Sequence, residues 1–98
     1  KVRRPYTGIT GMELDSQTAQ KNNLVEGIYV KDVEDFSAAE KAGIKIGDVI
    51  IEADGKKVKT MDELNEVKNS HNIGDEMKIK INRAGQEKEL TLTLGEQP

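Results

Sequence analysis

Cysteine is absent from this 98-residue sequence, and histidine occurs once, as His71. Without cysteine there is no disulfide bond, no thiolate metal ligand and no cysteine nucleophile. One histidine is too few for the ligand spacing of a zinc site. Ser70 is its neighbour, but adjacent residues on a helix do not face each other, so no Ser-His-Asp set is expected. The sequence therefore predicts no catalytic residue, no metal and no cofactor in this segment.

Aromatic residues are scarce, since Tyr6, Tyr29 and Phe36 are the only three, and the net charge is −3. A nucleic-acid-binding domain would show a basic stripe with aromatic side chains that stack on bases. The basic residues within the first four positions are typical of a solvated linker. We therefore expect no nucleic acid among the partners.

Long hydrophobic runs are also missing. No apolar segment approaches the roughly eighteen residues of a membrane-spanning helix, so we expect no membrane contact by this domain itself. Apolar and charged residues make up 35% and 34% of the chain, which is typical of a globular domain with a highly charged surface. The chain opens on Lys1 rather than Met, which predicts a fragment of a longer protein. We expect a linker over 1–5, one domain over 6–95 and a tail over 96–98.

Alternating apolar residues predict strands at several places. The clearest are 77–81 and 90–94, where isoleucines and leucines alternate with polar residues and a turn at 83–86 joins the two strands. Further strands are expected at 9–12, 27–33, 47–53 and 57–58, with a turn at Asp54-Gly55. Capping boxes at 37–40 and 60–63 predict helices over 38–42 and from 61 to 69 or 70. A third short helix over 16–21 is compatible with the sequence, and this order of elements predicts an α+β domain.

The stretch from Tyr6 to Met12 is the candidate functional site. Gly8 allows the backbone to adopt a positive φ angle or to approach another group closely. Successive N–H groups around such a glycine can form a concavity that binds an anion, and a carboxylate would suit it. The strand that follows could offer an open edge to an extended peptide. When the stretch is taken alone, a glycine before a strand marks a tight turn or bulge more often than an anion site.

The chain resembles PDZ domains, in the form found in HtrA/Deg serine proteases. Two stretches carry the resemblance: Tyr6-Thr7-Gly8-Ile9, and residues 38–58 with Ala42-Gly43-Ile44, Gly47-Asp48 and an apolar strand before the glycine turn. With the hairpin at 83–85, the resemblance extends from Tyr6 to Leu94. It implies a partly open antiparallel barrel or sandwich of five to six strands capped by two helices, in the circularly arranged bacterial variant. In that reading Gly47-Asp48 has a structural role.

The resemblance also implies roles for individual residues. The N–H groups of Thr7, Gly8 and Ile9 would hold a peptide carboxylate, and residues 9–12, which include Thr10, Gly11 and Met12, would pair with the ligand strand. The helix from Met61 would form the opposite wall through Met61, Asn65 and Lys68. Tyr6 and Ile9 would line the pocket for the last ligand side chain, and Leu64 either joins them or belongs to the core. Thr7, Asn65 and Lys68 are more polar than the residues usual at such positions, but an apolar C-terminal residue remains the expected ligand.

The function implied is recognition of C-terminal carboxylates of unfolded or signal proteins, in a domain that tethers substrates to, or regulates, the protease domain of the same chain. The parent would be an extracytoplasmic quality-control serine protease, in the periplasm or at the cell surface, of a kind that is often anchored to the membrane through another part of the chain. Two alternatives remain open. The domain could belong to an intramembrane metalloprotease or a C-terminal processing peptidase, or it could be a structural docking domain that binds no free peptide.

Overall fold

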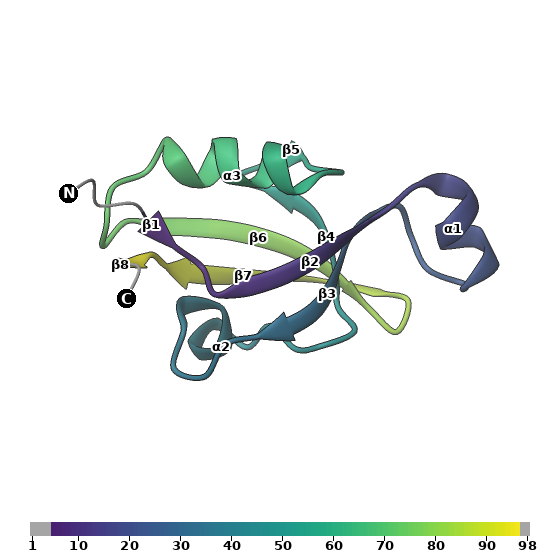
Figure 1. The fold of residues 1–98 in the computed structure, drawn as a ribbon, viewed down its shortest axis with the longest axis horizontal. Helices are drawn as coiled ribbons and strands as arrows, with labels where there is room; N and C mark the ends of the chain where they lie inside the picture. The colour runs from purple at the N-terminus through teal and green to yellow at the C-terminus, as the bar shows by residue number, and fades with distance from the viewer. Residues whose placement is uncertain (1–4, 97–98) are drawn as a thin grey trace.

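The computed structural model describes residues 5–96, which form an open antiparallel sheet of six strands accompanied by three helices (Figure 1). The strands are β2 (Ile9–Leu14), β3 (Gly27–Val33), β4 (Val49–Ala53), β5 (Lys56–Lys57), β6 (Glu76–Arg83) and β7 (Gln86–Thr93). Their order is β2-β3-β4-β6-β7, with β5 paired to β4. Because this order has two ends, β2 and β7 are the edge strands of the long sheet.

The helices are α1 (Ser16–Lys21), α2 (Ala38–Ala42) and α3 (Met61–Asn69). A separate two-stranded sheet joins β1 (Pro5–Tyr6) to β8 (Gly95–Glu96) and brings the two ends of the described chain together. None of the helices in the described range 5–96 is long and apolar enough to cross a membrane. The predicted linker and tail lie mostly outside this range, so their boundaries stay predictions.

The main core lies on one face of the long sheet and includes side chains from both α2 and α3, which lie on opposite sides of the strands in Figure 1. The alternation predicted for β6 is confirmed, because Met77, Ile79 and Ile81 are fully buried while Lys78 is exposed. Leu92 and Leu94 continue the same core after the hairpin turn, together with alanines of α2 and Leu64 of α3. This burial of aliphatic side chains is the main source of stability for a domain of this size.

A second, smaller core explains the third helix. Leu14, Ala19 and Val49 are buried together, and the partly buried Tyr29 and Ile51 pack against them. Helix α1 contributes Ala19 to this cluster and has the bounds that the sequence suggested for a short additional helix. The resemblance implied two helices, so α1 is an addition that covers apolar residues outside the main core.

The helix caps predicted from the sequence are confirmed. The Ser37 hydroxyl accepts a hydrogen bond from the Glu40 N–H at 3.2 Å, and the Glu40 carboxylate accepts one from the Phe36 N–H at 2.9 Å. The Glu40 carboxylate thus reaches the residue before the cap, while the Ser37 N–H of the predicted box donates to the Glu34 carbonyl. At the start of α3, Thr60 and Glu63 form the full capping box. Helix α2 ends at Gly43, whose φ of 97° is the left-handed conformation that favours glycine.

Asp48 has the structural role that the sequence indicated. Its side chain is 2% exposed and forms a bidentate salt bridge with Arg83, whose Nε and Nη2 donate at 2.8 and 2.7 Å. Arg83 Nη2 also donates to the Gly43 carbonyl at the end of α2, and Asp48 accepts the Lys45 N–H. Burial alone would raise the pKa of Asp48, but these hydrogen bonds and the Arg83 charge outweigh it and lower the pKa.

Candidate functional site

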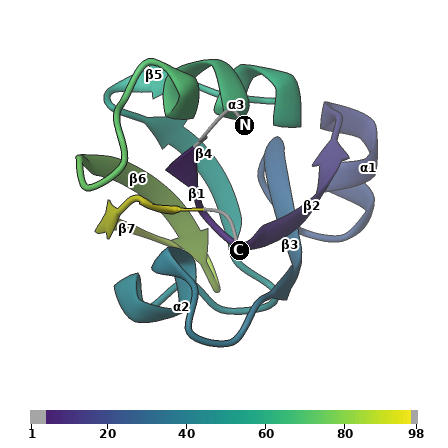
Figure 2. The ribbon, with the colours of Figure 1, turned by 60° about the vertical axis from the view of Figure 1, so that its left-hand side comes forward.

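The strand that the sequence offers to a ligand is at the edge of the sheet. Among the described residues, β2 pairs with β3 and with no other strand of the long sheet. Helix α3 contacts both β1 and β2, so it lies alongside this edge (Figure 2). The register of β2 against β3 shifts between Thr10 and Gly11, which marks a local bulge. An extended segment could add to the free side of β2 before or after this irregularity.

The loop before β2 is held by α2 and by the turn that precedes α2. The Thr7 carbonyl accepts a hydrogen bond from the Ala39 N–H at 2.9 Å. The Gly8 carbonyl accepts one from the Glu34 N–H, also at 2.9 Å. By contrast, none of the loop and turn hydrogen bonds of the described chain uses the N–H of Thr7 or Gly8 as donor. Two consecutive carbonyls are therefore engaged on the same side of the loop.

This arrangement determines where the neighbouring N–H groups point. In a planar trans peptide the carbonyl of one residue and the N–H of the next point in opposite directions. The Thr7 carbonyl points to α2, so the Gly8 N–H points away from α2. The Gly8 carbonyl likewise directs the Ile9 N–H away from Glu34. The Glu34–Gly8 hydrogen bond lies next to the Ile9–Val33 pair, and hydrogen-bonded and non-hydrogen-bonded pairs alternate along an antiparallel ladder. The Ile9–Val33 pair is therefore of the non-hydrogen-bonded type, so the Ile9 N–H points away from β3, to the free side of β2.

Gly8 satisfies both reasons that the sequence suggested for a glycine. Its φ is 82°, which L side chains rarely adopt. A Cβ placed on it would also lie 2.2 Å from Ser37 Cβ and 2.6 Å from Ser37 Oγ. The close neighbour is thus a residue of the domain itself, and the glycine lets the loop pack directly onto the start of α2.

On the opposite wall, Met61 crosses from α3 to β2. A Cβ on Gly11 would lie 2.9 Å from Met61 Sδ and 2.5 Å from Ile28 Cγ2, so these side chains already fill the space beside that glycine. Met61 is partly buried and packs against the main core. Asn65 and Lys68, one and two turns further on, are also partly buried. The predicted wall residues therefore lie on one side of α3, with Met61 in contact with the strand.

The structure separates some residues that the resemblance grouped together. Leu64 is 1% exposed and belongs to the main core, so of its two predicted places the core is the one occupied. Thr7 is buried in the loop, whereas Thr10 and Met12 of β2 are exposed. Ile9 is partly buried against the core, and its predicted place in a ligand pocket stays a prediction. Tyr6 lies in β1, and its predicted contact with a ligand stays a prediction.

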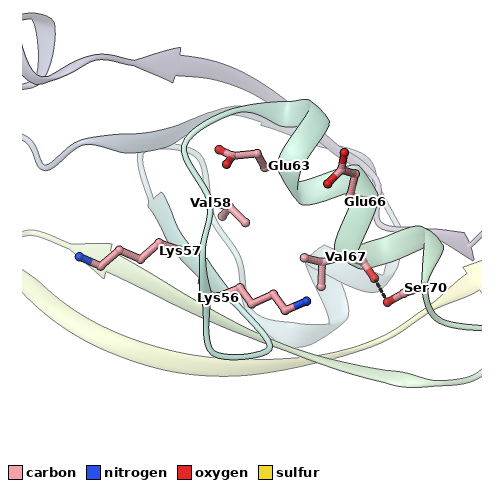
Figure 3. Close-up of a pocket in the computed structure, with 7 residues that line it drawn as sticks. All are labelled: Lys56, Lys57, Val58, Glu63, Glu66, Val67 and Ser70. Atoms are coloured by element: carbon pink, nitrogen blue, oxygen red, sulfur yellow. Dashed lines mark hydrogen bonds between the residues drawn. The ribbon is translucent and has the colours of Figure 1, made fainter.

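The other side of α3 borders an open hollow of about 280 Å³ (Figure 3). Its lining comes from Lys56, Lys57, Val58, Glu63, Glu66, Val67 and Ser70. Residues 63, 66 and 70 lie about half a helical turn away from 61, 65 and 68, given 3.6 residues per turn. Lys56 extends across the hollow towards Val67 and Ser70, while Lys57 points away from it. Helix α3 is therefore bordered by β2 on one side and by a hollow on the other.

Sequence reasoning missed the part that α2 plays in this site. Glu34, Ser37 and Ala39 hold the loop, yet they are about thirty residues away from it in sequence. The capping box at Ser37 was visible, but a local motif does not reveal which distant segment packs against it. The signal that could have suggested the contact is that Gly8, in a distant stretch, has no side chain and therefore leaves room for another segment such as the cap at Ser37.

Comparisons with known proteins agree with this architecture. A family model described as a PDZ domain matches residues 5–94. The serine protease Do-like HtrA of Lactobacillus helveticus is 36% identical over 101 residues, covering 96% of this chain and 24% of the relative. The periplasmic serine endoprotease DegP of Escherichia coli (strain K12) is 33% identical over 96 residues, covering 96% of this chain and 20% of the relative. The chain thus spans about a quarter or less of these relatives.

Solved structures show the same likeness. The HtrA-type protease AlgW with a decapeptide superposes with a TM-score of 0.86 at 26% identity, covering 99% of this chain and 30% of that one. The HtrA3 PDZ domain bound to a phage-derived ligand gives a TM-score of 0.84 at 19% identity, covering 98% and 89%, which is a likeness of fold. Since the family model matches almost all of the described residues and the sheet and helices agree with it, this chain belongs to the PDZ domain family.

Proposed function

We propose that this domain binds the C-terminal ends of peptides, with the terminal carboxylate at the N–H groups of the Thr7–Ile9 loop and the peptide added as a strand to β2. The observation that carries the proposal is the capture of the Thr7 and Gly8 carbonyls by Ala39 and Glu34, which aims the next two N–H groups away from α2. Charge-assisted hydrogen bonds from such donors to a carboxylate contribute about 1.5–3 kcal/mol each.

The position of the carboxylate sets the direction of the peptide. A C-terminus at the start of β2 requires the peptide to run antiparallel to β2, with its last residue beside Ile9 and its third residue from the end near Gly11. Alternate side chains point to the same side of a strand, so these two residues would face α3 together. Met61 would meet the third residue from the end, and an apolar last residue would pack near Ile9.

The biological setting is inferred from the relatives. Curated relatives are named as HtrA or DegP serine proteases, and some of those names describe a periplasmic protein. We propose that the parent of this domain is a serine endopeptidase of that kind, located outside the cytoplasm. Its PDZ domain would capture exposed C-termini of unfolded or signal proteins, and so tether substrates or regulate the protease domain of the same chain.

A pair of otherwise identical peptides tests the proposal, one with a free C-terminal carboxylate and one amidated, both ending in an apolar residue. We expect the free acid to bind with a dissociation constant of roughly 1–100 μM, and amidation to weaken binding at least about tenfold. Chemical shift changes in the free-acid titration should be largest at the Gly8 and Ile9 amides. Equal binding of both peptides, or shifts confined to another surface, would contradict a carboxylate site in this loop.

A further inference from the structure

We infer that Ser37 is the positioning residue of the carboxylate loop: it acts through Gly8 and sets the direction of the ligand-binding N–H groups without touching the ligand. The inference rests on the proposed function and adds a residue that lies far from the loop in sequence. Ser37 is 5% exposed, so its hydroxyl is directed into the protein.

The hydroxyl of Ser37 joins the turn to the helix. Its Oγ donates to the Glu34 carbonyl at 2.7 Å and accepts the Glu40 N–H at 3.2 Å. The Ser37 N–H also donates to the Glu34 carbonyl at 3.3 Å. Glu34 in turn gives its own N–H to the Gly8 carbonyl. Hydrogen bonds on both sides of Glu34 therefore connect the cap of α2, through the backbone of Glu34, to the carbonyl that directs the Ile9 N–H.

A second path reaches the other donor. Ser37 sets the start of α2, and Ala39, two residues into the helix, donates its N–H to the Thr7 carbonyl. That carbonyl directs the Gly8 N–H. The Ser37 side chain also packs directly against Gly8, so closely that a methyl group on Gly8 would not fit. The three contacts fix both peptide planes, so a change at Ser37 is expected to turn both donors together.

The local backbone is also unusual at this turn. Phe36, immediately before Ser37, has a φ of 63° although it is not glycine, and its side chain is 84% exposed. A conformation of this kind costs free energy and persists only where surrounding contacts impose it. The Phe36 N–H donates to the Glu40 carboxylate, and the Ser37 hydroxyl bonds to the Glu34 carbonyl and to the Glu40 N–H. The turn is therefore set by its hydrogen bonds and not by the preference of its own sequence.

The experiment compares Ser37→Ala with Asp15→Ala. Both remove the cap of a short helix, since the Asp15 carboxylate accepts the Thr18 N–H at 2.7 Å, but Asp15 follows the far end of β2 and does not contact the loop. The free-acid and amidated peptides are titrated into each folded variant by calorimetry. We expect Ser37→Ala to weaken free-acid binding about five- to tenfold while amide binding changes less than about twofold. Asp15→Ala should leave both affinities within about twofold of the original domain.

The ratio of free-acid to amide affinity separates positioning from stability. A purely structural role would lower the melting temperature of the Ser37 variant and leave that ratio unchanged, which would overturn the inference. If the unmodified domain does not distinguish the two peptides, the proposed function itself fails. Should Ser37→Ala not fold, Ser37→Gly serves instead, because glycine is an accepted cap residue and removes the hydroxyl with a small cost to the helix. If Ser37→Gly leaves the ratio of free-acid to amide affinity unchanged, that result also overturns the positioning role of Ser37.

Discussion

Helices α2 and α3 flank the candidate site from two sides, and the shorter of them is held more firmly. The five residues of α2 include two buried alanines, its first turn donates to the Thr7 carbonyl, and Arg83 bonds to the Gly43 carbonyl at its end. The nine residues of α3 include one buried side chain, Leu64, and its outer side borders a hollow. Helix length therefore does not decide how well a helix is anchored; non-local hydrogen bonds and close backbone packing do.

In the proposed function, this difference in how α2 and α3 are anchored assigns a different task to each helix. The α2 side fixes backbone donors, which suits an invariant group such as a carboxylate and lowers the entropy lost on binding. The α3 side presents Met61, a flexible thioether side chain that adapts to irregular surfaces. Changes on the α2 side should therefore alter recognition of the carboxylate, while changes on the α3 side should alter side-chain preference.

The largest effect is expected from removing the buried carboxylate that anchors the end of α2. Asp48→Ala leaves Arg83 without its ion-pair partner, and loss of one member of a buried pair costs about 3–5 kcal/mol. Because the Arg83 side chain is 28% exposed and can be partly hydrated, we expect a loss at the lower end of that range. Urea denaturation followed by circular dichroism measures this loss. Adding Arg83→Met should recover part of it, because no unpaired charge remains. A loss below about 1 kcal/mol would show that α2 does not depend on this contact.

The same carboxylate predicts a dependence on pH. The pKa of Asp48 is lowered in the folded domain, since the Arg83 and Lys45 contacts outweigh the effect of burial. Its stabilisation is therefore fully present above the pKa of an unfolded aspartate and is lost as the pH falls through the lower, folded pKa. We expect the stability difference between the original domain and Asp48→Asn to shrink as the pH is lowered from about 7 to about 3. A difference that grows in acid would contradict this assignment.

The next effect tests the close packing of the loop. Gly8→Ala introduces a Cβ that would lie 2.2 Å from Ser37 Cβ, at a φ of 82°, so we expect a loss of about 2–3 kcal/mol and weaker binding of free-acid peptides. Gly43→Ala is the matched control, because its φ is 97° but no atom lies within 4 Å of the added Cβ. The control should lose about 1 kcal/mol, the cost of the backbone conformation alone. Equal losses would show that the contact with Ser37 is unimportant.

A smaller effect, and of a different kind, is expected on the α3 side. Met61→Ala removes the side chain that lies against Gly11, so preference at the third ligand residue from the end should change about three- to tenfold, equivalent to about 1 kcal/mol. The ratio of free-acid to amide affinity should stay the same. Met61→Leu keeps the volume and should bind nearly as the original domain does. A peptide array with the third residue varied measures the preference, and a changed free-acid ratio would break the proposed division.

The smallest effect is expected at the end of α3. His71 Nε2 lies 2.5 Å from an Asp54 carboxylate oxygen, and both side chains are partly exposed. Polar contacts between partly exposed side chains contribute about 1 kcal/mol or less, so His71→Gln should change the free energy of unfolding by no more than that. A loss of about 2 kcal/mol or more would mean that α3 is anchored as firmly as α2.

Local sequence patterns predicted the elements well. The capping boxes at Ser37 and Thr60 indicated helices that begin where α2 and α3 begin, and the alternation through 77–81 and 90–94 predicted a hairpin with one buried face. These signals succeed because caps, turns and periodic burial depend on residues a few positions apart. The resemblance extended the prediction to the architecture, apart from the helix count, where α1 adds a third.

Contacts between distant residues were not predictable in the same way. Asp48 was assigned to structure without its partner Arg83, thirty-five positions away, and nothing in the sequence pointed to the Ser37–Gly8 contact. The resemblance placed Met61 on the wall opposite β2, but not its sulfur directly beside Gly11. The pairing of β1 with β8 at the two ends of the described chain was also missed. Such contacts depend on how complete elements pack, which a short stretch of sequence does not encode.

By itself, the sequence determined the two capped helices, the strands of the 77–94 hairpin and the glycine that a left-handed turn requires, because each follows from local chemistry. The tertiary structure alone decided the direction of the N–H groups in the loop. Gly8 permits many conformations, and only the hydrogen bonds from Glu34 and Ala39, together with the packing of Ser37, select one of them. In the proposed site, a flexible residue directs two N–H groups because distant parts of the chain hold it in place.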